Sequence, residues 1–327
     1  ERTEYGELLN TVVGYQENRE FDKAEALWQE VLDRNNNFDL AYLGIGKVYL
    51  ENGDYEAAMD YFKLIHNQSY YSKAYKLLRA EQMQSAGFFV LAGAVVAVVL
   101  LVLFFGFAKR YNEKRRSAPA TGRLRDELMF AFYTMFHPFA GFYELKNERR
   151  GSRRAASILV ALAVAAALFR DFGCAYLQKN IDKPPSIPSA LANILLPLLL
   201  WCVANWCLTS LMDGKGTMGD ICVATAYSLL PMTLFTLCTT VVGHFLVADE
   251  LALLQFASNI GLIWTLALVF LSMLNTHEYS LGRSVAVALL SILVIGIILF
   301  LLMILFSLSG RMVSLVGNII EELSFRA

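Results

Sequence analysis

Charged residues are scarce in this chain. They make up 17% of its 327 residues, whereas hydrophobic residues make up 56%, and the mean hydropathy is +0.46. Soluble domains carry about 25% charged residues, so this composition predicts a membrane protein. The formal net charge of −1 conceals an uneven distribution, because residues 1–80 are acidic and residues 109–154 are strongly basic. Since the chain begins at Glu1 and not at a methionine, we expect an upstream segment or a leader that has been removed.

Side chains that bind metals or carry redox chemistry are also few and dispersed. The cysteines are Cys174, Cys202, Cys207, Cys222 and Cys238, and the histidines are His66, His137, His244 and His277. No two cysteines form a CxxC pair, and all lie in or beside apolar runs, which indicates buried structural thiols. No histidine has a second histidine or a carboxylate at ligand spacing within a helix. The sequence therefore predicts no enzyme, no resident cofactor and no metal site.

Within the acidic N-terminal region, similar residues recur at a spacing of 34 positions. The aligned pairs are Tyr15 and Tyr49, Phe21 and Tyr55, Ala24 and Ala58, Trp28 and Phe62, and Val31 and Ile65. The small residues Gly46 and Ala58 favour a close crossing of two antiparallel helices, and Asn52-Gly53-Asp54 predicts the turn between them. These residues resemble the tetratricopeptide repeat family over about residues 5–68. A third, capping helix is expected at residues 69–84.

The resemblance implies a surface that binds partner proteins and does not catalyse a reaction. The candidate partner-binding residues are Tyr42, Tyr49, Tyr55 and Tyr71 in this region, with Glu321 and Glu322 near the C-terminus. A short spacer or docking module is the alternative interpretation, because two repeats and a cap are few for a peptide groove.

Residues 86–108 form an uncharged run of 23 residues, and a basic cluster follows it directly. A helix of this length spans the roughly 30 Å hydrocarbon core of a bilayer. The basic flank predicts that its C-terminal end faces the cytoplasm and that residues 1–84 lie outside. No proline separates Ser69 from this run, so we expect the capping helix to continue into the span. A flexible junction is the alternative, because Gly87 is a weak helix breaker.

Five further apolar stretches predict a total of six spans. They cover about residues 155–176, 190–212, 221–246, 251–274 and 285–309. The predicted inner loops hold Lys109, Arg110, Lys114, Arg115, Arg116, Arg123, Arg125, Lys146, Arg149, Arg150, Arg153, Arg154, Lys215 and Arg283. The outer loops hold Lys179, Lys183, Arg311 and Arg326. This asymmetry predicts a multi-pass plasma-membrane protein with its N-terminal repeat and its C-terminus outside.

Aromatic residues crowd the segment between the first two spans. They are Phe130, Phe132, Tyr133, Phe136, Phe139, Phe142 and Tyr143. Rings with basic flanks favour the head-group boundary of a membrane, and His137-Pro138 is expected to break the segment because a residue before proline avoids the helical region. We therefore expect an interfacial helix, a break and a second helix on the cytoplasmic leaflet. Residues 310–327 are expected to form an amphipathic surface helix.

Three stretches resemble the membrane domain of the Yip (Ypt-interacting protein) family over about residues 127–309. They are FHPFAGFYELKNERRGSRRAASILVALA, LMDGKGTMGDICVATAYSLLP and THEYSLGRSVAVALLSIL. The matching motif residues are His137, Pro138, Gly214, Lys215, Gly216, Tyr227 and Pro231. The resemblance implies five spans with a cytoplasmic start. Eukaryotic members resemble organisers of vesicle traffic that bind small GTPases through a cytoplasmic N-terminal region. The inner segment 109–154 is short and basic, so that role is not expected here. Some bacterial members accompany carbohydrate ABC importers.

The sequence thus predicts an all-α protein: a short tetratricopeptide-like repeat, then a six-span bundle made of one linker span and a five-span Yip-like domain. The expected parts are residues 1–84, 85–108, 109–154, 155–309 and 310–327. The predicted function is a non-enzymatic scaffold or accessory subunit in a membrane complex, with an ABC-importer permease or binding protein as partner, anionic lipid at the basic inner segment and no nucleic acid. The alternative is a transporter or channel subunit with its own conduction path, in which Arg170 and Asp171 would take part.

Overall fold

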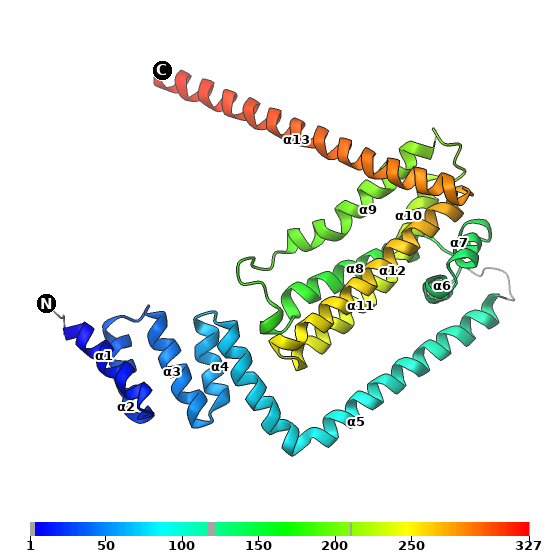
Figure 1. The fold of residues 1–327 in the computed structure, drawn as a ribbon. Coiled ribbons are helices and arrows are strands. Elements are labelled where there is room, and N and C mark those ends of the chain that lie inside the picture. The colour runs from blue at the N-terminus through cyan, green and yellow to red at the C-terminus, as the bar shows by residue number, and fades with distance from the viewer. Residues whose placement is uncertain (1–3, 117–121, 210, 327) are drawn as a thin grey trace. The chain divides into compact units, whose positions relative to one another are not determined.

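The computed structural model describes residues 4–116, 122–209 and 211–326, without the side chains of residues 86 and 319–326. All regular elements in these ranges are helices (Figure 1). The chain divides into two compact units, which we describe separately. Unit 1 comprises Glu1–Gly106, Arg170–Pro185 and Cys238–Ala257, and unit 2 comprises Phe107–Phe169, Ser186–Leu237 and Ser258–Ala327.

Unit 1 begins with four short helices that pack in sequence. They are α1 (Glu4–Glu17), α2 (Phe21–Arg34), α3 (Asp39–Asn52) and α4 (Tyr55–Leu64). A Cβ atom added to Gly46 would lie 2.6 Å from the ring of Phe62, so the small residue permits the expected close crossing of α3 and α4. Gly53 has a φ of +85° in the turn between them, a conformation that glycine adopts without strain.

The fifth helix, α5 (Gln68–Arg116), joins a polar first part to an apolar second part without interruption. The expected continuation of the capping helix through Gly87 is present, and α5 bends sharply at one point in Figure 1. The candidate span within α5 is Gly87–Arg116, and no residue of its most apolar 18-residue stretch is buried. Unit 1 also includes the loops that carry the 3₁₀ turns η1 (Tyr176–Gln178), η2 (Gly243–Phe245) and η3 (Ala248–Glu250).

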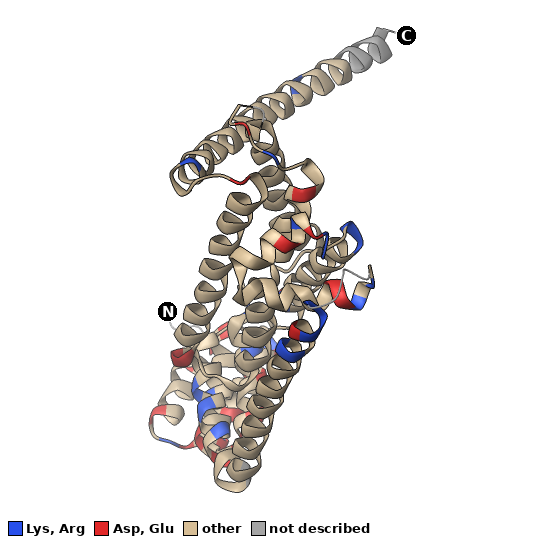
Figure 2. Ribbon diagram, turned by 90° about the vertical axis from the view of Figure 1, so that its right-hand side faces the viewer, with Lys and Arg blue, Asp and Glu red and all other residues tan. Residues whose placement is uncertain are grey.

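Unit 2 holds the packed parts of the remaining helices. They are α6 (Leu124–Phe136), α7 (Pro138–Asn147), α8 (Arg153–Gly173), α9 (Ile187–Thr209), α10 (Met218–Ser228), α11 (Leu230–Val242), α12 (Leu251–His277) and α13 (Leu281–Arg326), of which the ends of α8, α11 and α12 reach into unit 1. Among the residues that the structure describes, six candidate spans satisfy the length and hydropathy of a membrane crossing. In Figure 2 these helices are mostly tan along their lengths. The chain is a multi-pass membrane protein, as its composition predicts.

Two spans have a form that the sequence did not predict. The fourth span consists of α10 and α11, which are separated at Leu229, so the motif residues Tyr227 and Pro231 lie on either side of a break between two helices. The last span and the expected tail are one helix of 46 residues, α13. The boundary expected at residue 310 is therefore not marked by a change in backbone conformation.

Helical periodicity decides which small residues are buried and corrects the expectation about the cysteines. On α8, Ala163, Ala166 and Ala167 are buried whereas Ala161 and Ala165 are exposed, because residues three and four apart share a face. Cys202 is buried, but Cys207 and Cys238 are exposed. The expectation that every cysteine is buried is therefore wrong.

Candidate functional site

The break between α6 and α7 organises a stack of three side chains. His137 ends α6 with φ −129° and ψ 64°, and Pro138 occupies the first position of α7, where its missing N–H costs nothing. The His137 ring stacks on Tyr133 with centroids 4.6 Å apart. The guanidinium of Arg116 also lies over the Tyr133 ring, 4.4 Å from its centroid. A Cβ atom on Gly141 would lie 2.7 Å from Cα of Thr134, so α6 and α7 cross closely only because residue 141 is glycine.

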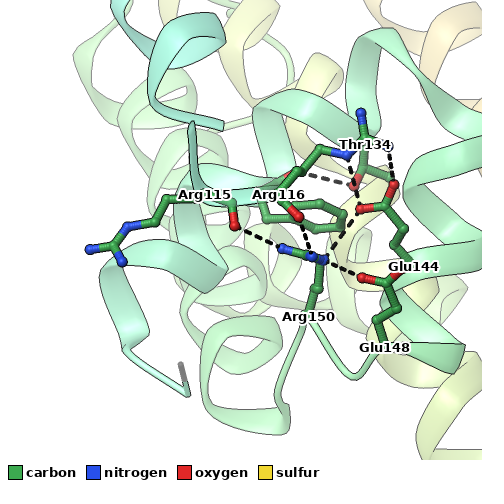
Figure 3. A network of polar contacts seen from close by, with 7 residues as sticks. Arg115, Arg116, Thr134, Glu144, Glu148 and Arg150 are labelled. Carbon is green, nitrogen blue, oxygen red and sulfur yellow. Dashed lines mark hydrogen bonds and ion pairs between the residues drawn. The ribbon is translucent and has the colours of Figure 1, made fainter. Parts of the chain in front are cut away.

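Two arginines converge on one buried carboxylate beside this stack (Figure 3). The Glu144 side chain is 8% exposed and accepts hydrogen bonds from Nε and Nη2 of Arg116. Arg150 Nε lies 3.3 Å from Glu144 Oε2 and 2.7 Å from Glu148 Oε2. Arg150 also donates to the main-chain carbonyls of Arg115, at 3.3 Å, and Arg116, at 2.9 Å, near the C-terminal end of α5. This network holds the end of α5 to α7 and to the loop that leads into α8.

A second contact joins α10 to α6 and α8. Tyr227 is fully buried, and its hydroxyl donates to the main-chain oxygen of Glu127 at 3.0 Å. The Glu127 carboxylate accepts a hydrogen bond from Ser152 Oγ. Ser152 Oγ in turn accepts from Ala155 N at 3.2 Å and so caps α8. The family-motif residue Tyr227 therefore fixes the helix starts on this side of unit 2.

The glycine turn at residues 214–216 packs on the end of α12. Gly216 N donates to His277 Nδ1 at 3.3 Å, and His277 Nε2 lies 2.7 Å from Asn205 Oδ1. Because a backbone N–H can only donate, Nδ1 is the acceptor and the proton lies on Nε2, which donates to Asn205. A Cβ atom on Gly214 would lie 2.4 Å from Tyr279 Oη, so a side chain at this position would push the turn away from His277.

A cluster of three ion-paired side chains covers this turn at the surface. Glu278 accepts hydrogen bonds from Lys215 Nζ at 2.6 Å and from Lys146 Nζ at 3.0 Å. The bond from Lys215, and then the bond from Lys146, lower the pKa of the Glu278 carboxyl from its ordinary value of 4.5 to about 2. Lys215 therefore links the glycine turn to α7 through Glu278.

The motif residues of unit 2 are thus used in contacts between helices. Sequence reasoning identified His137, Gly214, Gly216 and Tyr227 but did not show that Arg116, Asn205 and Glu127 take part in their contacts. Among the described residues, no group of three or more His, Cys, Asp or Glu side chains is placed to hold a metal ion. The adjacent charges Arg170 and Asp171 pair with each other at 3.0 Å, as the sequence indicates. The contacts of the motif residues position the helices. None of these motif residues forms an acid–base or nucleophilic pair in the described part of the chain.

Unit 1 contains a separate polar contact between α5 and the loops of residues 176–179 and 243–250. Arg79 donates to Glu250 through both Nη1, at 2.6 Å, and Nη2, at 2.9 Å. Tyr75 Oη donates to the His244 carbonyl at 2.8 Å. Gln68 Nε2 donates to the Lys179 carbonyl at 2.9 Å. We call these residues the outer contact. Sequence reasoning placed Glu250 near a span end but missed Arg79, although Lys73, Lys76 and Arg79 recur at the three-residue spacing of one helix face.

Three of the four candidate partner-binding tyrosines make close contacts within unit 1. Tyr49 stacks on Tyr61 at 5.5 Å, and its hydrogen bond to Glu25, together with burial, raises the pKa of its hydroxyl to about 12. Tyr42 donates to the Asn36 carbonyl at 3.0 Å. Tyr71 packs on Tyr176, with centroids 4.5 Å apart, within unit 1.

Tyr55 differs from these because it lines an open hollow of about 370 Å³ between the start of α4 and α5, together with Glu56, Leu78 and Gln82. The side chains of Glu321 and Glu322 lie outside the described residues.

A comparison with protein families matches the Yip1 domain over residues 132–303. This range is 172 of the 327 residues and lies within the expected range of 127–309. Comparison with curated proteins and with solved structures found no match.

Proposed function

The chain belongs to the Yip1 domain family, and we propose that it is a non-enzymatic membrane scaffold or accessory subunit. The observation that carries this proposal is the use of the motif residues. Gly216 and Tyr227 hold helices to one another, and the His137 ring stacks on Tyr133 at the break between α6 and α7. A rigid bundle of this kind is suited to presenting surfaces to other subunits.

We propose that the tetratricopeptide-like region of residues 1–84 supplies one docking surface, centred on Tyr55. The hollow beside Tyr55 is lined by Glu56 and Glu81 as well as by Leu78. It therefore suits a partner segment with an apolar and a basic side chain. An ABC-type importer for carbohydrates is the assembly to test first, with its permease or binding protein as the partner, and the inner basic segment contacts anionic lipid.

Mild-detergent purification of the full chain, followed by identification of its subunits by mass, tests the scaffold. Stoichiometric partner subunits are expected. Tyr55→Ala is expected to lower their recovery, whereas Tyr143→Ala, the same change at a tyrosine of unit 2 that is 57% exposed, leaves it unchanged. A chain recovered alone from its native membrane would contradict the proposal. Substrate flux in liposomes containing this chain alone, with loss on changing Arg170, would support a transporter instead.

We propose a plasma-membrane location with the repeat and the C-terminus outside, because basic residues concentrate in the predicted inner loops. Single cysteines at Lys63 and at Lys114, in a chain whose own five cysteines are replaced by alanine, test this orientation. In intact cells an impermeant maleimide is expected to label position 63 and to label position 114 only after permeabilisation. The reverse pattern would overturn the orientation.

A further inference from the structure

The inner segment carries more positive charge than its own carboxylates balance. Residues 107–154 contain twelve Lys and Arg residues and five Asp and Glu residues, a difference of +7. Five of the twelve cations lie in ion pairs. They are Lys109 with Glu113, Arg115 with Asp126, Arg116 and Arg150 with Glu144, and Lys146 with Glu278. These cations serve the fold, because each pair joins residues of the same unit.

The other seven cations are exposed at the surface of unit 2. They are Arg110, Lys114, Arg123, Arg125, Arg149, Arg153 and Arg154. Within the part of the chain that the structure describes, none of them has a carboxylate oxygen within 4.0 Å. Their charge is therefore available to an external anion.

Five of these seven surround the place where α6 and α8 begin. The Ser152–Glu127 hydrogen bond pins the start of α8 to the first turn of α6, and Tyr227 Oη bonds the main chain of Glu127 from beneath. Arg123 and Arg125 flank the start of α6, and Arg149, Arg153 and Arg154 flank the start of α8. We call these five residues the arginine junction.

The depth of the arginine junction matches the head-group layer. Arg153 is the first residue of the candidate span Arg153–Gly173, and a helix of 21 residues extends about 32 Å, close to the thickness of the hydrocarbon core. The neighbouring helices α6 and α7 expose Phe136, Phe139 and Tyr143 by 51%, 61% and 57%. Exposed rings beside cations without a paired carboxylate are suited to a ligand that has both acyl chains and phosphates. Nucleic acid provides phosphates but no acyl chains.

We propose that the arginine junction is a docking surface for the head groups of anionic phospholipids. The inference rests on the inner orientation in the proposed function and deepens it by naming the residues. It separates the basic residues that bind lipid from those, such as Arg116 and Arg150, that hold the fold.

The test uses the full chain, purified in detergent and mixed with equal amounts of phosphatidylglycerol and phosphatidylcholine. Native mass spectrometry then counts the lipids retained. The triple change Arg149→Ala, Arg153→Ala and Arg154→Ala is expected to lower retained phosphatidylglycerol at least about tenfold, since each basic residue near an anionic surface adds to the attraction. Phosphatidylcholine retention is expected to stay unchanged. The matched control removes three exposed cations of unit 1, through Lys63→Ala, Lys73→Ala and Lys183→Ala.

Retention of phosphatidylglycerol by the junction variant at the level of the unchanged chain would overturn the inference. So would an equal loss in the control variant, or displacement of the lipid by an equal concentration of inorganic phosphate. Replacement of the same three arginines by lysine keeps the charge and is expected to keep at least half of the binding. If the alanine variant does not fold, Arg123→Gln with Arg125→Gln gives the same test. Loss of lipid binding leaves partner recovery unaffected, so failure of this inference is distinguishable from failure of the scaffold proposal.

Discussion

Single glycines decide how closely the helices of unit 2 approach one another. At Gly141 the nearest atom to an added Cβ would be Cα of Thr134 at 2.7 Å, which is main chain and cannot rotate away. At Gly296 of α13 no such atom lies within 4 Å. The same residue type is therefore required at one position and dispensable at the other.

Gly141→Ala is expected to destabilise the protein by about 1–3 kcal/mol, because it forces α6 and α7 apart. Gly296→Ala is the matched control and is expected to be neutral or to stabilise by up to about 1 kcal/mol, since alanine favours a helix interior. Thermal unfolding in detergent, followed by tryptophan fluorescence, measures both. Equal transition temperatures for the two variants would contradict the close crossing.

Glu278 makes a second prediction at the scale of one residue. Its folded-state pKa of about 2 lies below its ordinary value of 4.5, so its contribution to stability is complete above about pH 4.5 and is lost as the pH falls toward 2. Glu278→Gln is expected to lower the transition temperature at neutral pH and to match the unchanged chain near pH 2. Glu51→Gln, at an exposed position of α3, is the control. A difference that stays constant from pH 7 to pH 2 would argue against the Lys215 and Lys146 pairs.

At the scale of elements, the break between α10 and α11 is satisfied by a neighbouring helix. Met232 N donates to Thr265 Oγ1 of α12 at 3.0 Å. Thr233 on α11 instead donates to the Leu229 carbonyl of its own segment at 3.0 Å. The break is therefore stable because α12 accepts a main-chain hydrogen bond that α11 does not use.

Thr265→Val keeps the shape of the side chain and removes the acceptor. It is expected to cost about 1–3 kcal/mol, because the Met232 N–H is left without a partner. Thr233→Val is the control and is expected to cost less, since it removes only a local bond. Chemical denaturation monitored by circular dichroism compares the two. A larger loss from Thr233→Val would show that the break is satisfied in another way.

The outer contact of unit 1 is a second relation between elements. Arg79→Glu and Glu250→Arg are each expected to destabilise it, and the double exchange is expected to restore about 0.5–1 kcal/mol of coupling, a modest value because both side chains are about one third exposed. Hydrogen exchange of residues 243–250 reports the effect. Faster exchange in the double variant than in either single variant would refute the pairing.

At the scale of the whole molecule, the cations fall into two groups with different roles. Paired cations such as Arg116 and Arg150 hold helices within unit 2, whereas the arginine junction is left for an external anion. Raising the salt concentration is expected to weaken lipid retention by the junction, because exposed charges are screened over about 10 Å at 0.1 M salt. Thermal stability is expected to change less, since Glu144 is buried between its arginines. A parallel fall of both properties would contradict this separation.

Much of the architecture is predictable from the sequence because its signals are local. An apolar run of sufficient length predicts a span by composition alone, and the six runs correspond to six candidate spans. His137-Pro138 likewise predicts a break, since a residue before proline avoids the helical region. The prediction that every cysteine is buried was wrong because burial depends on the face that each helix presents.

The sequence by itself determined the helical class, the spans and the positions of the helix breaks, since each depends on residues that are neighbours in the chain. Only the tertiary structure decided which charged and polar groups meet. Arg79 meets Glu250 across 171 positions, Tyr227 meets Glu127 across 100 and His277 meets Asn205 across 72. Such pairs form because packing brings distant helices within hydrogen-bond distance. The scarcity of charge therefore indicates a membrane protein, and the fold determines which of the few charges are left to bind something else.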